Sequence, residues 1–189
     1  MRIVAGKFRG KNLAPSTHLK LRPTTDKNRE SLFNILSSAK FIKEIGFEIV
    51  ESKVLDLCCG TGAVGFEALS RGAKSVTFID NDSAHLDLVA KNSKSLGVEN
   101  CAKIMCLDAK NLPKSDENFD LIFVDPPYSA DYLAIMESLL KSGFIKEKTL
   151  IIIEFSIDAK LENIFAEKIK FLNSRSYGKT MFWFGCYLL

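Results

Sequence analysis

The chain alternates between short apolar runs, which are typical of strands, and amphipathic runs, which are typical of helices. Strands are predicted at residues 53–57, 75–80, 102–108, 120–125 and 149–155. Helices are predicted at residues 27–44, 63–71, 84–96 and 131–142. A helix between two successive strands can carry the chain back across a sheet, so that the strands run parallel. The alternation therefore predicts an α/β fold that is doubly wound around a mostly parallel sheet.

The end of the chain departs from this alternation. Residues 167–189 contain two extended apolar runs that are separated only by the turn-like residues 176–179. Two strands joined by so short a turn must be antiparallel. We therefore expect a sheet of seven strands, mostly parallel and ending in an antiparallel hairpin, with helices on both faces.

The length of 189 residues is that of one domain with a substantial core. No apolar run approaches the ~20 residues that a membrane-spanning helix needs, and the basic N-terminus lacks the apolar core of a signal peptide. The five cysteines form no CxxC pair and there are only two histidines. We therefore expect reduced thiols, no metal site, no membrane partner and a cytoplasmic protein.

Basic residues are concentrated near the N-terminus. Residues 1–30 contain eight Lys or Arg and two acidic residues, whereas the whole chain carries a net charge of +3. The rest of the chain is therefore net negative. We treat residues 1–30 as a basic N-terminal arm and residues 31–189 as the main domain. Such an arm either meets a polyanionic partner or is a solvated tail, and charge alone leaves both alternatives open.

A glycine-rich loop follows the first strand. Gly60-x-Gly62-x-x-Gly65 matches a dinucleotide fingerprint, and Asp80 follows Gly60 by 20 residues at the end of the next strand. Alone, this pattern fits any adenosine cofactor. Asp56 inside the first strand and Asp108 at the end of the third add two acids, which could meet an ammonium group and an adenine amine. Together with Asp80 for a ribose, the acids describe S-adenosylmethionine, although each acid alone is as often a helix cap or turn residue.

The strand at 120–125 stops abruptly at Asp125, Pro126, Pro127 and Tyr128. The prolines fix φ and bias the preceding residue away from helix, which makes a stiff elbow. Asp125 and the Pro126 carbonyl would be two hydrogen-bond acceptors, and Tyr128 would be a stacking surface. Two acceptors and a flat ring suit the exocyclic amino group of a nucleobase. Because the carboxyl ends of such strands share one edge, we expect this motif beside the glycine loop.

The segments VLDLCCGTGAVG, FID and FVDPPY resemble class I S-adenosylmethionine-dependent methyltransferases that modify exocyclic amines. The segments MRIVAGKFRGKNL, LRPTTDKNRESLFNIL and YGKTMFWFGCYL are similar to the opening and closing segments of the RsmD family, bacterial 16S ribosomal RNA guanine-N2 methyltransferases. This resemblance covers essentially the whole chain. It implies a Rossmann-like fold, S-adenosylmethionine as the cofactor and methyl transfer to the N2 amine of a guanine. The chain departs from many relatives at Cys58, Cys59 and Tyr128, where backbone atoms or a ring face serve the function.

The resemblance also implies roles for individual residues. The cofactor would contact Asp56, Gly60 and Gly62 through its methionine moiety, Asp80 through its ribose and Asp108 through its adenine. The catalytic motif would be Asp125, Pro126, Pro127 and Tyr128, and the pocket would be closed by Arg22, Pro23, Thr24 and Arg29, with Thr24 at the cofactor. RNA would be contacted by Arg2, Lys7, Arg9, Lys11, Arg22 and Arg29. The implied partner is 16S rRNA, within the small ribosomal subunit or a late assembly intermediate.

Other functions stay open on the sequence alone. The motif at residues 125–128 reads an amino group rather than a base, so an adenine-N6 methyltransferase acting on DNA or RNA is the first alternative. The second is a catalytically silent RNA-binding module, although it would not need the acids. A NAD-dependent oxidoreductase leaves the motif unexplained, and the resembling protein glutamine methyltransferases prefer Asn where Asp125 stands. His18 and His85 have no convincing partner in the sequence and receive no role.

Overall fold

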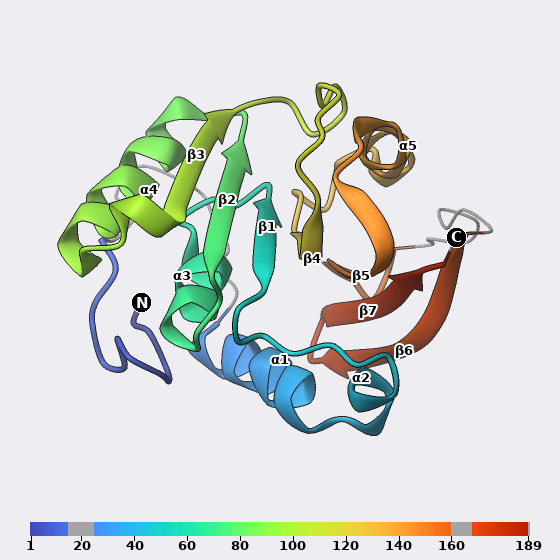
Figure 1. The fold of residues 1–189 in the computed structure, drawn as a ribbon, viewed down its shortest axis with the longest axis horizontal. Helices are drawn as coiled ribbons and strands as arrows, with labels where there is room; N and C mark the ends of the chain where they lie inside the picture. Colours follow the sequence, from blue (N-terminus) through green and yellow to red (C-terminus); the bar gives the residue numbers. More distant parts are fainter. Residues whose placement is uncertain (15–24, 160–167, 189) are drawn as a thin grey trace.

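The computed structural model describes residues 1–14, 25–159 and 168–188. One 7-stranded sheet has the order β3-β2-β1-β4-β5-β7-β6 (Figure 1). Its strands are β1 (Lys53–Leu57), β2 (Ser75–Asp80), β3 (Ala102–Cys106), β4 (Phe119–Val124), β5 (Ile145–Ser156), β6 (Ile169–Tyr177) and β7 (Thr180–Tyr187). The helices are α1 (Asp26–Ser38), α2 (Lys40–Glu44), α3 (Ala63–Ser70), α4 (Ser83–Leu96) and α5 (Tyr132–Ser142), with a short 3₁₀ helix, η1, at Glu99–Cys101.

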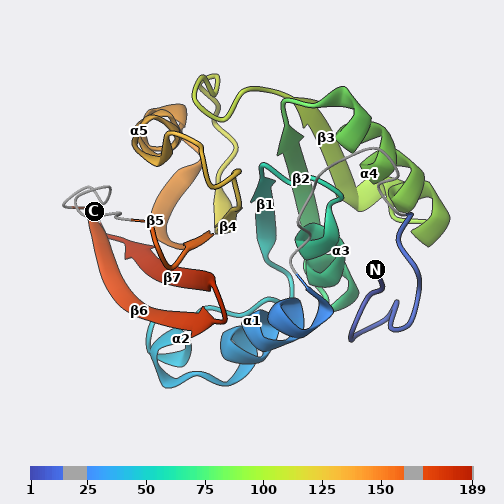
Figure 2. The ribbon, with the colours of Figure 1, turned by 180° about the vertical axis from the view of Figure 1, so that it is seen from behind.

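The strands β3, β2, β1, β4 and β5 are parallel to one another, and β7 pairs antiparallel with both β5 and β6. This confirms the prediction of a mostly parallel sheet that ends in an antiparallel hairpin. The order of the strands reverses at β1, because the chain adds β2 and β3 on one side of it and β4 and β5 on the other. Sheets of this kind bind ligands at the carboxyl ends of the strands beside the reversal. Figures 1 and 2 show the N-terminus and the β6–β7 hairpin at opposite ends of the sheet.

The single helix predicted at residues 27–44 is two helices. Ala39 is extended (φ −67°, ψ 137°), and this residue separates α1 from α2. The hydroxyls of Ser37 and Ser38 donate to backbone carbonyls one turn earlier, and such bonds compete with the helix at its end. Ile42 is still buried after the break, so the apolar spacing that suggested one helix continues across it.

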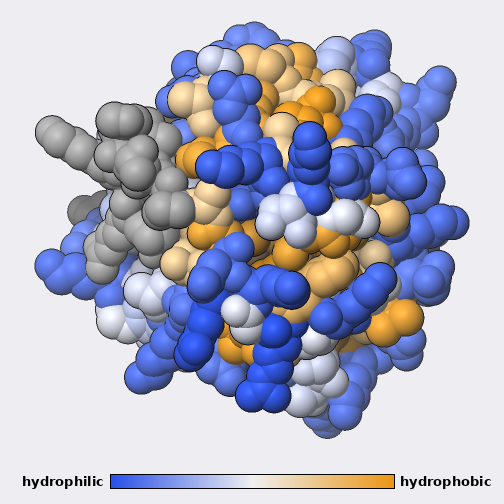
Figure 3. Space-filling model, turned by 90° about the vertical axis from the view of Figure 1, so that its left-hand side faces the viewer, coloured by the Kyte–Doolittle hydropathy of each residue, from blue (hydrophilic) through white to orange (hydrophobic). Residues whose placement is uncertain are grey.

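The start of the basic arm is folded against α3. The backbone N–H groups of Val4 and Ala5 donate to the two carboxylate oxygens of Glu67 at 2.8 and 3.0 Å. Gly6 has a φ of +80°, and a Cβ there would lie 1.9 Å from the carbonyl oxygen of Ser70, so this approach requires glycine. Figure 3 views this side of the molecule, where hydrophilic residues cover much of the surface. The boundary predicted for the arm falls within α1.

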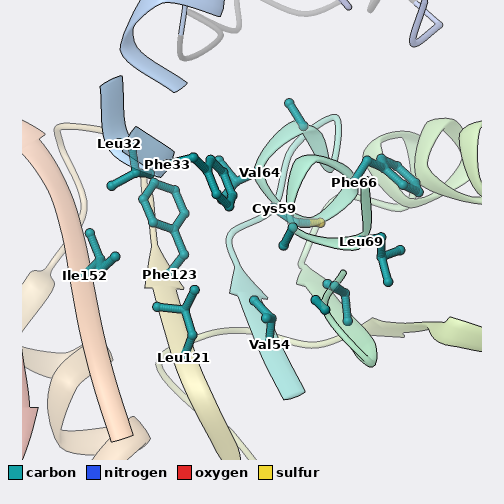
Figure 4. Close-up of a cluster of buried hydrophobic side chains, with 14 of the residues drawn as sticks. Leu32, Phe33, Val54, Cys59, Val64, Phe66, Leu69, Leu121, Phe123 and Ile152 are labelled. Carbon is teal, nitrogen blue, oxygen red and sulfur yellow. The ribbon is translucent and has the colours of Figure 1, made fainter. Parts of the chain in front are cut away.

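The two faces of the sheet carry separate apolar clusters. On β1, Val54 belongs to the cluster shared with α1, α3 and α4, whereas Leu55 belongs to the cluster shared with α5. Figure 4 shows the first cluster, in which Leu32 and Phe33 of α1 lie close to Phe123 of β4. Burial of each such side chain contributes about 1.5–3 kcal/mol. Helices therefore cover both faces of the sheet, as predicted. The carboxyl ends of the parallel strands all lie at one edge of the sheet, which the helices leave uncovered.

Candidate active site

A pocket of about 750 Å³ lies at the carboxyl ends of the central strands. Among the described residues, its charged lining is mainly acidic: Asp56, Asp80, Asp108, Asp125, Asp131 and Glu154, with Lys110 and His85. Burial raises the pKa of the Cys58 thiol in the pocket wall, and nearby carboxylates raise it further: Asp80, Asp125, Asp56 and Asp108. The pocket is therefore electronegative and suits a ligand with positive charge or hydrogen-bond donors.

The loop between β1 and α3 forms one wall of the pocket. Cys58 and Gly60 both have positive φ values, 62° and 52°, and both line the pocket. The Gly60 N–H donates to Asp80 Oδ2 at 2.8 Å, which ties the loop to the end of β2. Gly62 turns toward the core instead, because a Cβ there would lie 2.9 Å from the Phe66 ring. Gly62 is not among the residues that line the pocket, and its predicted contact with the cofactor stays a prediction.

Asp56 lies near the end of β1 and is buried. Its Oδ2 accepts a hydrogen bond from the Gly65 N–H at 2.9 Å, within the first turn of α3. Burial raises the pKa of Asp56 to about 7, against the lowering effect of the Gly65 bond. A cation placed beside this carboxylate in the pocket would favour its ionised form.

Asp80 is the last residue of β2, and its carboxylate holds the neighbouring backbone of the pocket wall. Besides the Gly60 bond, its Oδ1 accepts from the Asp82 N–H at 3.0 Å. His85 Nδ1 lies 3.1 Å from the same oxygen, and His85 Nε2 lies 3.9 Å from Asp82 Oδ2. His85 is buried and lines the pocket, although the sequence suggested no role for it. Its position in the first turn of α4, directly after β2, was the signal that could have placed it at this edge.

Asp108 lies two residues beyond the end of β3, which stops at Cys106 rather than at Asp108 as predicted. Its Oδ1 accepts from the Lys110 N–H at 2.9 Å, and its Oδ2 accepts from Asn111 Nδ2 at 3.3 Å. The turn that these bonds form keeps Asp108 at the pocket. The structure thus brings the three acids predicted for the cofactor to one pocket.

The motif at residues 125–128 forms another part of the pocket lining. β4 ends at Val124, and the Asp125 N–H donates to the Leu57 carbonyl at 3.2 Å, which holds Asp125 against the end of β1. The Pro127 carbonyl accepts from the Ala130 N–H at 2.8 Å and closes a turn. Tyr128 is 42% exposed at the pocket. Its ring is therefore accessible to a flat ligand that enters from solvent.

Glu154 is a pocket residue that the sequence reasoning missed, and Tyr132 of α5 contacts its backbone. Glu154 lies on β5, is 5% exposed and lines the pocket. The Tyr132 hydroxyl donates to the Glu154 backbone carbonyl at 3.4 Å. Burial raises the pKa of Tyr132, and the charge of Asp125 raises it further. The signal for Glu154 is the same as for Asp125: an acid that ends an apolar run.

Four of the residues predicted to contact RNA lie exposed in the arm: Arg2, Lys7, Arg9 and Lys11. Arg29 is different and corrects the prediction, because its side chain is fully buried. Its Nη2 lies 2.9 Å from Asp26 Oδ1, and its Nε lies 3.6 Å from Glu67 Oε2. Arg29 therefore holds α1 and α3 together and does not face RNA or the pocket. The predicted residues Arg22, Pro23 and Thr24 lie outside the described residues.

The five cysteines are free thiols. Within the described ranges 1–14, 25–159 and 168–188, no cluster of three or more His, Cys, Asp or Glu side chains is arranged to hold a metal ion. In that same part of the chain, no helix is both long and apolar enough to cross a membrane.

Residues 1–186 match the family model described as Conserved hypothetical protein 95. The chain is 33% identical to ribosomal RNA small subunit methyltransferase D of Escherichia coli K12, over 87% of this chain and 79% of that protein. It is 35% identical to the protein of the same name from Haemophilus influenzae, over 85% of this chain and 81% of that protein. The solved structure of yhhF from Escherichia coli has a TM-score of 0.80 at 29% identity and covers 100% of this chain and 98% of its own. The chain therefore belongs to the Conserved hypothetical protein 95 family, the family of the ribosomal RNA small subunit methyltransferase D proteins.

Proposed function

We propose that the chain transfers a methyl group from S-adenosylmethionine to the N2 amine of a guanine in 16S rRNA. One observation carries this proposal: the motif at residues 125–128 faces the same pocket as Asp56, Asp80 and Asp108. The motif suits an amine that accepts the methyl group, and the three acids suit the cofactor that provides it. The names of the relatives support ribosomal RNA of the small subunit as the substrate.

The residues at the pocket fit S-adenosylmethionine by the chemistry of their donors and acceptors. When bound, this cofactor supplies a methyl group on a positively charged sulfur. Asp56 would accept from the ammonium group, Asp80 from the ribose hydroxyls and Asp108 from the adenine amine. Both oxygens of Asp80 already hold loop amides, and a carboxylate has further lone pairs for a ligand. The Cys58 and Gly60 backbone, held by these bonds, would present a preformed surface to the cofactor.

The motif residues would position the target base. Asp125 and the Pro126 carbonyl would accept from the two N–H groups of the amine and so orient its nitrogen. The exposed Tyr128 ring would stack on the base, which is typically worth ~1–3 kcal/mol. That gain can offset the few kcal/mol that base flipping requires. Asp125 would also stand beside the nitrogen as positive charge develops on it, where a fixed negative charge is stabilising.

We further propose that Arg2, Lys7, Arg9 and Lys11 contact the phosphates of the rRNA. Together with the lining acids, they would give the protein a negative pocket for the cofactor and a positive surface for RNA. We propose as the substrate the small subunit, or a late intermediate of its assembly, and the cytoplasm as the place of action.

Labelled S-adenosylmethionine, incubated with small subunits from cells that lack the enzyme, tests the proposal. Nucleoside mass spectrometry of the product should detect N2-methylguanosine in 16S rRNA. N6-methyladenosine would keep the chemistry but replace guanine with adenine as the target. Absence of incorporation into subunits, naked rRNA and DNA alike would favour a silent RNA-binding module.

Asp125→Ala should lower the transfer rate by about 100-fold or more, because the amine loses its orientation. Cofactor affinity, measured by calorimetry, should change little. The matched control is Asp87→Ala, which removes an exposed acid on α4 and should preserve both quantities. Equal loss of cofactor binding and transfer in Asp125→Ala would make Asp125 a structural residue and contradict its catalytic role.

A further inference from the structure

We propose that Glu154 selects guanine as the target base by accepting a hydrogen bond from its ring N1–H. This inference rests on the proposed transfer to guanine N2 and names the residue that makes the site specific. It assigns the carboxylate of β5 to base recognition, beside the motif that holds the amine.

The register of the sheet places Glu154 next to Asp125. Val124 of β4 pairs with Ile153 of β5. The next residues are Asp125, which directly follows β4, and Glu154, which lies within β5. Neighbouring strands lie about 4.8 Å apart. Two residues earlier, Phe123 pairs with Ile152, and both side chains belong to the cluster beneath α1 and α3. Because strand residues alternate between faces, Glu154 should share that face, and it lines the same pocket as Asp125.

The backbone of Glu154 is held by two neighbouring elements. Phe182 of β7, itself fully buried, pairs with Glu154 across the sheet. The Tyr132 hydroxyl donates to the Glu154 carbonyl from α5. The side chain is only 5% exposed although it lines the pocket.

Guanine is the amino-bearing base that fits an acceptor at this place. The amines of adenine and cytosine adjoin a ring nitrogen that is an acceptor, whereas the guanine amine adjoins N1–H, which is a donor. An ionised carboxylate can only accept hydrogen bonds. Glu154 would therefore bond with N1–H of guanine and oppose the ring lone pair of the other bases. The motif at residues 125–128 would bind the amine, and Glu154 would make the site specific for the base that carries this amine.

The nucleobase 2,6-diaminopurine tests this contact, because it keeps the N2 amine but has a lone pair in place of N1–H; it also carries an amine in place of the O6 carbonyl. The target guanine, once mapped, is replaced with 2,6-diaminopurine in a synthetic segment that is ligated into 16S rRNA and reconstituted into subunits. For the wild-type chain, kcat/KM should be about 100-fold or more lower with 2,6-diaminopurine than with guanine, as expected when a buried acceptor meets no donor.

Glu154→Gln should lower the ratio of kcat/KM with guanine to kcat/KM with 2,6-diaminopurine to about 10-fold or less, because the glutamine amide can donate to the N1 lone pair. Glu147→Gln is the matched control, since Glu147 is an exposed residue on the same strand, and it should keep the wild-type ratio. Comparison of ratios between variants cancels the different cost of flipping the two bases. Thermal unfolding and cofactor affinity of each variant report separately on folding.

Two results would overturn the inference. Equal kcat/KM of the wild-type chain with both bases would do so without any variant, even if Glu154→Gln failed to fold. An equal loss with both bases in a folded Glu154→Gln variant would show that the carboxylate is only structural. Methylation of another base, with guanine untouched in the unmodified subunit, would instead refute the proposed function, and the reaction with natural subunits shows this first.

Discussion

Asp56 lies buried beneath the loop between β1 and α3, where its carboxylate accepts from Gly65 and faces the pocket. Burial raises the pKa of this group from 3.8 to about 7. Between these values the folded chain keeps a proton that the unfolded chain has released. Stability therefore falls as the pH rises from about 4 to about 7, by roughly 1.4 kcal/mol for each unit of the pKa shift.

Asp56→Asn should remove this pH dependence, because the amide keeps an acceptor for Gly65 and does not titrate. The free energy of unfolding of the wild type, relative to the variant, should fall by roughly 4 kcal/mol between pH 4 and pH 7.5. Urea denaturation of both proteins across this range measures the difference. A difference that stays constant with pH would show that Asp56 is already ionised in the fold.

At the scale of residues, the sequence predicted where the acidic residues of the pocket lie better than it predicted the contacts of their neighbours. Asp56, Asp80 and Asp108 come together because each lies near the carboxyl end of a parallel strand or just after it, and such positions share one edge of a sheet. Arg29 differs from the prediction because its role depends on its contact with Glu67. Nothing in local spacing reveals that contact.

At the scale of elements, α3 joins the arm to the rest of the fold. Glu67, which is fully buried on α3, accepts from the arm at Val4 and Ala5. It also lies 3.6 Å from Arg29 of α1 and 2.8 Å from Arg71. One carboxylate thus holds two backbone donors and two guanidinium groups.

Glu67→Gln should destabilise the fold by about 3–5 kcal/mol, because it removes the fully buried one of the two carboxylates that pair with Arg29. Glu137→Gln is the matched control, since Glu137 also pairs with a basic residue four positions later, Lys141, at an exposed site. The control should cost less than about 1 kcal/mol. Urea denaturation gives both values, and hydrogen exchange at Val4 and Ala5 reports on the arm. Similar small losses in the two variants would contradict this role of Glu67.

The sequence predicted the elements of the sheet because each carries its own periodicity. The break at Ala39 was missed because Ile42 keeps the apolar spacing across it. The folding of the arm onto α3 was missed for another reason. Its bonds join residues that are 62 and 63 positions apart, and a pairing at that distance leaves no pattern in either segment.

At the scale of the whole molecule, charge separates two surfaces. Acids line the pocket, whereas Lys7, Arg9 and Lys11 are exposed in the arm. The arm reaches the pocket wall through Asn92 of α4, whose Oδ1 accepts from the Ala14 N–H at 2.7 Å. Asn92 Nδ2 in turn lies 3.5 Å from the carbonyl of Thr61, a pocket residue. Lys7, by contrast, lies at the other end of α3 from the pocket residues Ala63 and Val64, because its N–H donates to the carbonyl of Ser70.

Replacement of Lys7, Arg9 and Lys11 with Ala should weaken RNA binding and flatten its salt dependence. If each residue meets one phosphate, the slope of log K against log salt concentration should become shallower by about 2, at ~0.7 for each contact with single-stranded RNA. The matched control changes Lys168, Lys170 and Lys179, three exposed lysines of the β6–β7 hairpin at the other end of the sheet (Figure 1). That variant should keep the wild-type slope. Filter binding of rRNA over a series of KCl concentrations measures all three slopes. An unchanged slope in the arm variant would mean that its charges are solvated and that RNA meets another surface.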